Sequence, residues 1–171
     1  MTVDTIQLLA RYNARANAAL NEILAQLPAS DWDKDQGGYF SSYRSLTSHL
    51  YTADIVWLLR FSSHRRFATV AGAPFDRPPQ FGVPAFGGFD EYLPLRRVAD
   101  EKLLSFAEEL TDADLATDLT YQDSRGTVYT KNFGGLVLHL FNHQTHHRGH
   151  ISMLLDQAKV ANDYSNISAM L

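Results

Sequence analysis

Apolar residues recur at three- and four-residue steps through four long stretches of this chain. These stretches cover residues 3–27, 42–67, 89–110 and 132–159. The spacing follows the turn of an α-helix, whose buried side returns at every third or fourth position. A helix with one apolar side must cover that side with other elements. The pattern therefore predicts an all-α fold in which long helices pack into a bundle.

The segments between these stretches have a different character. Residues 117–130 contain alternating apolar positions and a glycine-containing turn, which predicts a short β-hairpin before the last helix. Residues 71–88 are rich in proline and glycine, which stop helices and strands alike. Such a loop is either a lid over a binding site or a connector across the end of the bundle, and both interpretations stay open. Residues 162–171 are expected to form a loosely ordered tail. At this length we expect one domain, residues 1–171.

Charge and composition argue against several classes of function. The formal net charge of −4 argues against a nucleic-acid partner, which would favour a basic patch. The chain has no cysteine, so any metal must be held by histidine or carboxylate side chains or by water. We predict no signal peptide from the first residues, and no apolar run approaches the roughly 18 residues that a membrane span needs. We therefore expect a cytoplasmic protein with no membrane partner.

Five of the seven histidines fall within residues 139–150. Imidazole is the commonest protein ligand for transition metals, so this density marks a candidate site. At about 100° per residue, His143 and His147 face the core side of the predicted last helix. They are four positions apart, a spacing at which two imidazoles can share one metal. The other three turn progressively toward the flank of the helix: His139, His146 and His150.

Two imidazoles do not close a metal site, and His49 is the natural third ligand. It lies at the edge of the apolar stripe of the second predicted helix, half turned toward the core. Three neutral imidazoles retain an ion and leave positions free for water or substrate. The alternative is a polar, hydrogen-bonded bundle interior or an adventitious metal site. Of the polar residues elsewhere, His64 is expected at the surface, and Asn13 is expected to be satisfied by neighbouring helices.

Residues 138–150, Leu-His-Leu-Phe-Asn-His-Gln-Thr-His-His-Arg-Gly-His, come close to a known signature, His-x-x-x-His-His-Arg-Gly. On this match the chain resembles the DinB/YfiT-like family, whose members are regarded as metal-dependent enzymes. Weaker matches lie around His49 and in Tyr12-Asn-x-x-x-Asn17, and the resemblance covers nearly the whole chain. Arg15 stands where relatives often have Trp, and His150 replaces a frequent Gln.

The resemblance implies a four-helix bundle with up-down-down-up connectivity and a short β-hairpin before the last helix. It implies a divalent transition metal, such as Zn, Ni, Fe or Mn, bound by His49, His143 and His147. Relatives commonly form homodimers. Characterised branches include transferases and isomerases that use low-molecular-weight thiols such as bacillithiol or mycothiol.

We therefore expect a divalent-metal-dependent enzyme acting on a small-molecule substrate, either a thiol-dependent S-transferase or a metal-assisted hydrolase. Because the chain has no cysteine, a thiol would have to arrive as a cosubstrate. The alternative is a non-catalytic stress-response protein that binds a metal or a small molecule. Four further residues could support the ligands or hold an anion, or could equally be surface residues: His139, His146, Arg148 and His150.

Overall fold

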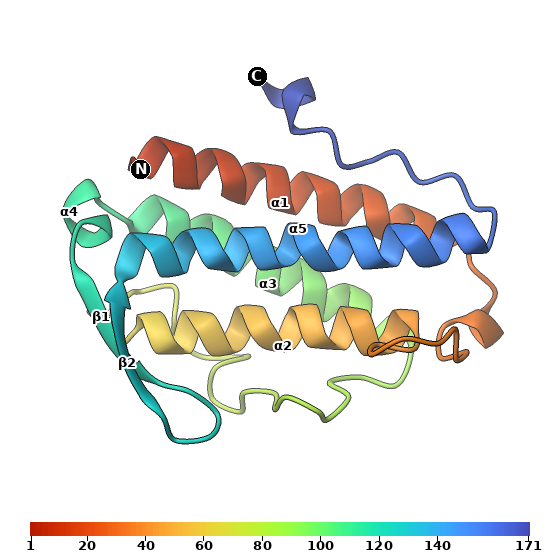
Figure 1. The fold of residues 1–171 in the computed structure, drawn as a ribbon, viewed down its shortest axis with the longest axis horizontal. Helices are drawn as coiled ribbons and strands as arrows, with labels where there is room; N and C mark the ends of the chain where they lie inside the picture. Colours follow the sequence, from red (N-terminus) through yellow and green to blue (C-terminus); the bar gives the residue numbers. More distant parts are fainter.

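A computed structural model describes residues 1–171, and four long helices form most of the fold (Figure 1). These helices are α1 Val3–Leu24, α2 Tyr43–Phe61, α3 Phe89–Glu109 and α5 Phe133–Gln157. α1 packs beside α3 and α5, and α2 packs beside the same two helices, so α1 and α2 stand at opposite corners of the bundle. α1 and α5 run in one direction, whereas α2 and α3 run in the other. The predicted all-α, up-down-down-up bundle is therefore confirmed.

The predicted apolar stripes form the core of the bundle. Burying one large aliphatic side chain contributes about 1.5–3 kcal/mol, so these stripes hold the four helices together. Between them, aromatic rings stack, as Phe61 of α2 does on Phe106 of α3 with ring centroids 5.4 Å apart. Each helix contributes fully or almost fully buried residues to this core: Ile6, Leu20, Leu46, Leu50, Ala99, Leu103, Leu140 and Ile151.

The start of α2 is fixed by its own sequence. The hydroxyl of Ser42 accepts a hydrogen bond from the Ser45 backbone N–H at 3.2 Å. The Ser42 backbone N–H in turn donates to the Ser45 hydroxyl at 3.0 Å. This reciprocal cap satisfies two amide groups that a helix start leaves without partners. α2 therefore begins where the sequence predicts, which sets the position of His49 seven residues later.

The end of α2 differs from the prediction, because the helix stops at Phe61 and does not continue to residue 67. The polar residues that follow bend away to reach Asp114, whose carboxylate accepts from Arg65 Nε at 2.9 Å. His64 joins them, with Nε2 3.2 Å from Asp114 Oδ1 and its ring stacked on Phe133 at 4.4 Å. The His64 side chain is only 14% exposed, so the prediction that it lies at the surface is wrong.

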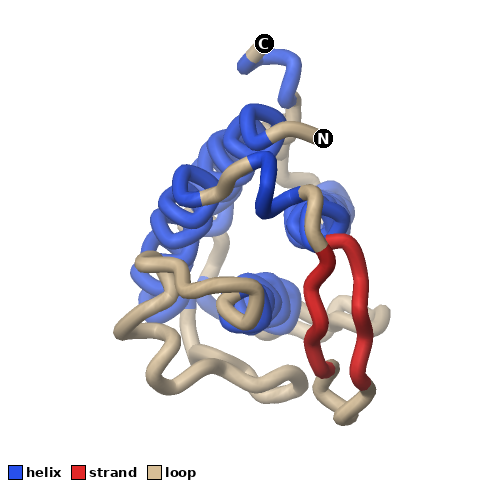
Figure 2. The backbone as a smooth tube through the Cα atoms, turned by 90° about the vertical axis from the view of Figure 1, so that its left-hand side faces the viewer, coloured by secondary structure: helices blue, strands red, loops and turns tan.

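The β-hairpin before the last helix is confirmed. β1 Asp118–Gln122 pairs antiparallel with β2 Val128–Asn132, and Gly126 supplies the positive φ of 86° that the turn requires. The hairpin stands along one side of the bundle (Figure 2). Asn132 ends β2 and also caps α5, since its side chain accepts from the Gly135 N–H at 2.8 Å. A short helix before the hairpin, α4 Asp112–Leu115, was not predicted.

A chain of buried polar groups links all four long helices. Asp54 of α2 forms an ion pair with Arg96 of α3 at 2.7 Å, and Arg96 pairs with Asp100 at 2.9 Å. Asn17 of α1 donates its amide to Asp100 at 2.7 Å and accepts from Arg148 of α5 at 3.1 Å. Buried polar groups are costly without partners, so this chain favours one relative placement of the helices.

The connection between α2 and α3 runs back along the outside of α2 (Figure 1). It is anchored by Phe75 and Phe86, which are buried, and by the Ala85 N–H, which donates to the Ser48 hydroxyl at 2.7 Å. The C-terminal tail also has contacts: the Tyr12 hydroxyl donates to the Ser165 carbonyl at 2.8 Å, before a short 3-10 helix at Ile167–Met170. None of the helices has the length and apolar character needed to cross a membrane.

Candidate metal centre

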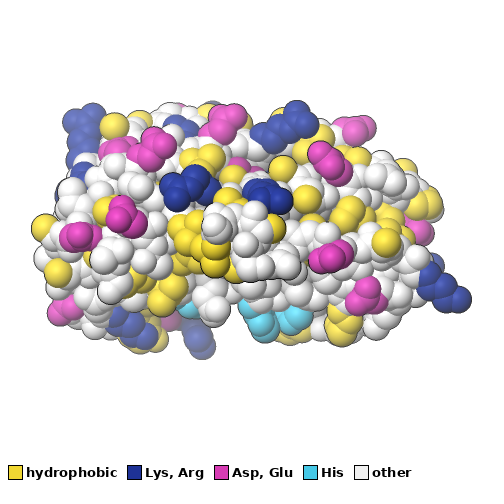
Figure 3. Space-filling view, turned by 90° about the horizontal axis from the view of Figure 1, so that it is seen from above, with side chains coloured by type: hydrophobic (Ala, Val, Ile, Leu, Met, Phe, Trp, Pro, Cys, Tyr) yellow, Lys and Arg dark blue, Asp and Glu magenta, His cyan; other side chains and the backbone are white.

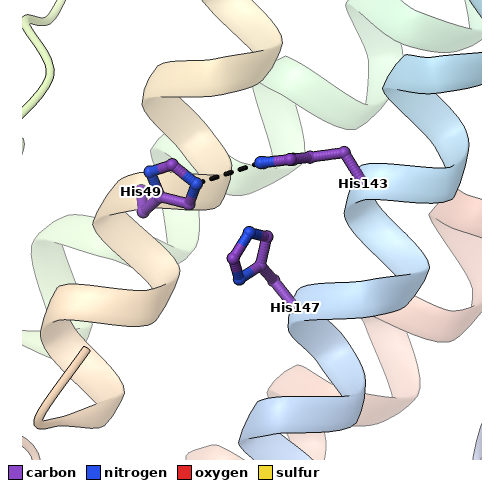
Figure 4. A group of neighbouring side chains, drawn as sticks. All are labelled: His49, His143 and His147. Carbon is purple, nitrogen blue, oxygen red and sulfur yellow. Dashed lines mark hydrogen bonds between the residues drawn. The ribbon is translucent and has the colours of Figure 1, made fainter. Parts of the chain in front are cut away.

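Three imidazoles from two adjacent helices converge at one point (Figure 4). His49 comes from α2, and His143 and His147 lie one turn apart on α5. One ligand nitrogen from each ring lies within 4.8 Å of the other two. His49 Nε2 and His143 Nε2 are 3.0 Å apart, and the rings of His143 and His147 are centred 4.4 Å apart. The fold thus brings together the three residues selected from the sequence, and they could hold one metal ion.

The surroundings keep these rings neutral. Burial, with the neighbouring imidazoles adding to it, lowers the pKa of His143 to about 4 and that of His147 to about 3. Burial also lowers the pKa of His49. A neutral imidazole has a free lone pair on one nitrogen, which is the form that binds a metal. The three side chains are therefore ready to act as ligands at neutral pH without first losing a proton.

Two buried nitrogens in the cluster have no hydrogen-bond partner: His143 Nδ1 and His147 Nδ1. These Nδ1 atoms therefore tie neither ring into a hydrogen-bonded network, and the nitrogen of His143 that meets His49 is Nε2. The donor set consists of nitrogens, with no carboxylate or thiolate among the three residues. Such a set favours transition metals such as Zn, Ni or Fe over Mg or Ca.

An aromatic wall and a cavity adjoin the cluster. The ring of Phe40 lies 4.5 Å from that of His49 and 5.3 Å from that of His147, and Phe81 lies 5.8 Å from His49. Phe81 belongs to the connection between α2 and α3, so this segment forms part of the wall around the site. A cavity of about 350 Å³ opens beside His49. Its lining combines aromatic rings with hydroxyl groups: Phe40, Ser45, Ser48, Thr52 and Phe81.

The three flanking histidines do not join the inner cluster directly. His139 is exposed, with its ring 5.4 Å from Trp57 and 5.9 Å from His143. His146 and His150 lie along the flank of α5, and their closest ring contact, at 4.4 Å, is with each other. None of the three hydrogen-bonds to a proposed ligand, so their expected supporting role is not seen in this geometry.

Arg148 is neither a surface residue nor a neighbour of the three imidazoles. It is 2% exposed and points to α1, where its guanidinium donates to the side-chain oxygens of Asn13 and Asn17. The ring of Tyr12 lies 5.4 Å from the guanidinium. The expected role of Arg148 beside the metal or an anion is therefore corrected, because one step along a helix turns a side chain by about 100° away from His147. The same contacts confirm that Asn13 is satisfied by a neighbouring helix.

Two residues near the site were not identified as site residues from the sequence. Gln144 follows His143, is fully buried, and donates to the carboxylate of Asp54 and to the Leu50 carbonyl at 3.3 Å. It joins α5 to α2 directly beside the three converging histidines. Its inward position could have been found from the helical period, since it falls near the core direction of α5. Phe40 could not, because it lies in an irregular segment whose path the sequence pattern does not determine.

The fold and the cluster can be set beside known proteins. The family model described as "DinB family" matches residues 1–164. Protein DinB of Bacillus subtilis (strain 168) is 26% identical over 153 residues, which is 90% of this chain and 86% of that protein. No solved structure matches the chain at a comparable level. The family match spans all four long helices and all three converging histidines.

Proposed function

Because the chain belongs to the DinB family, we propose that it is a metal-dependent enzyme whose ion is bound by His49, His143 and His147. One observation carries this proposal: three neutral imidazoles from α2 and α5 converge beside an open cavity. Within the cluster, a hydrogen bond joins His49 Nε2 to His143 Nε2, and an ion bound at this point would take both nitrogens as donors in its place.

The protein groups around the cluster have distinct tasks in this proposal. Phe40 packs on His49 and His147, limits their rotation and excludes water from one side. Ser45, Ser48 and Thr52 line the cavity and offer hydroxyls that could orient a polar substrate, although the Ser48 hydroxyl already accepts from Ala85. When bound, a divalent ion would act as a Lewis acid or lower the pKa of a thiol or water.

The absence of cysteine constrains one of the two candidate reactions. With no cysteine, the protein has no thiol nucleophile of its own, so S-transfer requires a low-molecular-weight thiol as cosubstrate. Transfer of such a thiol to a small electrophile is the first candidate, and metal-assisted hydrolysis is the second. A homodimer and a cytoplasmic location belong to the same proposal, and the family resemblance is what supports them.

The test begins with the metal content of freshly purified protein, followed by His147→Ala. This variant should lower metal affinity by more than the roughly 10–100-fold typical of losing an outer partner of a ligand. An ion at about 100 times its dissociation constant adds about 2.7 kcal/mol of stability, which is a rise of about 5–10 °C in Tm for a chain of this size. His147→Ala should lose this rise.

His139→Ala is the matched control, because His139 is an exposed histidine on the same helix that is not one of the converging three. It should keep both the metal and the rise in Tm. Equal loss in both variants, or no stoichiometric metal in the wild type, would reject the site. If metal binds at the site but no thiol transfer or hydrolysis appears across a broad panel of electrophiles, the protein is a metal-binding protein without this catalysis.

A further inference from the structure

A second group of imidazoles lies on the outer flank of α5. Ligand nitrogens of His146, His147 and His150 lie within 4.8 Å of one another. The ring centroids of His146 and His150 are 4.4 Å apart, and those of His147 and His150 are 5.1 Å apart. His146 and His150 are separated by one helical turn, the spacing at which two imidazoles can share an ion.

This outer group faces solvent, unlike the inner one. His146 is exposed and His150 is half-buried, whereas His147 is buried between the two groups. Histidine atoms reach the surface as a patch on the face drawn in Figure 3. A cavity of about 400 Å³ opens beside the outer group. Its remaining lining is largely apolar: Tyr39, Phe40, Leu46, Met153 and Leu154.

His147 connects the two groups. Its ring is centred 4.6 Å from that of His49 and 4.4 Å from that of His143, and it lies 4.9 Å from the ring of His146. An ion that moves from the outer to the inner group would therefore exchange His146 and His150 for His49 and His143, with His147 belonging to both groups. Each exchange replaces one imidazole by another and involves no change of charge or oxidation state.

We propose that His146, His147 and His150 form a second site for a divalent transition metal, and that ions captured there pass to the inner site through the shared His147. The binding part of this proposal is independent of the proposed function, whereas the transfer part rests on it. Nitrogen donors alone favour Zn, Ni or Cu over the harder cations. Once the inner site is filled, the outer one keeps two free imidazoles and binds more weakly.

Binding is tested by Zn²⁺ titration of the full chain in competition with a chelating dye. His49→Ala/His143→Ala removes two inner ligands and should still bind one Zn²⁺. Adding His150→Ala to this variant should weaken that binding by at least about tenfold. Loss of an outer partner of a ligand already costs roughly 10–100-fold in metal affinity, and His150 is a proposed ligand. Adding His139→Ala should leave it unchanged. Equal affinity with and without His150, or no binding by the double variant, would overturn the outer site.

Transfer is tested by stopped-flow loading of metal-free protein with Zn²⁺. His146→Ala/His150→Ala should keep the equilibrium affinity of the inner site and slow its loading several-fold. An unchanged loading rate would refute transfer while leaving the outer site intact. The proposed function and the outer site can be rejected separately. If His150→Ala lowers the metal affinity of the otherwise unaltered chain and His49→Ala does not, the inner site is rejected and the outer site is supported.

A measurement on the unaltered chain covers the case in which the double variants do not fold. Zn²⁺ shifts the NMR signals of the histidine rings that bind it. In a titration, the rings of the inner cluster should shift with the first equivalent, and those of His146 and His150 with further Zn²⁺. Signals of His146 and His150 that stay unchanged up to saturating Zn²⁺ would contradict the outer site.

Discussion

Arg148 directly follows the proposed ligand His147 in the sequence, but its side chain points away from the cluster to the neighbouring helix α1. Replacing it by Met keeps much of its apolar volume and removes the guanidinium. The side-chain oxygens of Asn13 and Asn17 then lose a buried donor. Each buried acceptor left without a partner costs about 1–3 kcal/mol, so Arg148→Met should cost about 2–6 kcal/mol of unfolding free energy.

The effect is measured on metal-free protein by urea unfolding and by calorimetry. For a chain of this length, a loss of 3 kcal/mol lowers Tm by about 6–12 °C. Metal affinity of the folded variant should stay within about twofold of the wild type, since the guanidinium contacts α1 and none of the three imidazoles. Arg97→Met, which removes an exposed arginine from α3, is the control and should cost less than about 0.5 kcal/mol.

Two results would refute this reasoning about Arg148. An unfolding free energy within 1 kcal/mol of the wild type would mean that the asparagines find other partners at little cost. A tenfold loss of metal affinity with the fold intact would mean that Arg148 acts on the site after all.

Further predictions concern pH, packing and the turn after α2. Because the pKa values of His143 and His147 are lowered to about 4 and about 3, the unfolded chain takes up their protons first. Their contribution to the unfolding free energy is therefore full above about pH 6.5 and falls as the pH drops toward 4. In His143→Gln/His147→Gln, the urea midpoint should fall less over the same pH range. Gly134→Ala would place a Cβ 2.7 Å from the Leu115 carbonyl oxygen, so it should cost about 1–3 kcal/mol in the same assay, and an unchanged midpoint would contradict this contact. Asp114→Ala removes the carboxylate that accepts from the Arg65 guanidinium and from the Thr111 backbone N–H at the start of α4. It should lower Tm measurably, and an equal Tm would show that the turn is held by other contacts.

Much of the fold could be predicted from the sequence, because it follows from local periodicity. The apolar steps along α5 place His143 and His147 on its inner side, and the same argument turns His49 half inward on α2. Convergence of the three then needs only that these two helices be neighbours, which the bundle provides.

Other features depend on partners far away along the chain. His64 sits in a polar stretch that suggests solvent, yet its partner Asp114 is 50 positions later. Arg148 is expected from the sequence beside the ligands or an anion, or at the surface, yet its partners Asn13 and Asn17 lie on α1. Neither partner is visible in a local pattern, so both residues were misplaced while the helices around them were located correctly.

The shared role of Asn132, as the last residue of β2 and the cap of α5, has a consequence for changes in chain length. The hairpin fixes the rotational phase with which α5 starts, ten or so residues before the first inward histidine. Extra residues at the tip of the hairpin, near Gly126, would leave that phase untouched. One extra residue inside α5 ahead of His143 would rotate every later side chain by about 100° and carry the imidazoles out of alignment with His49. Insertions at the hairpin tip should therefore leave the site intact, whereas a single insertion in the first turns of α5 should disrupt it.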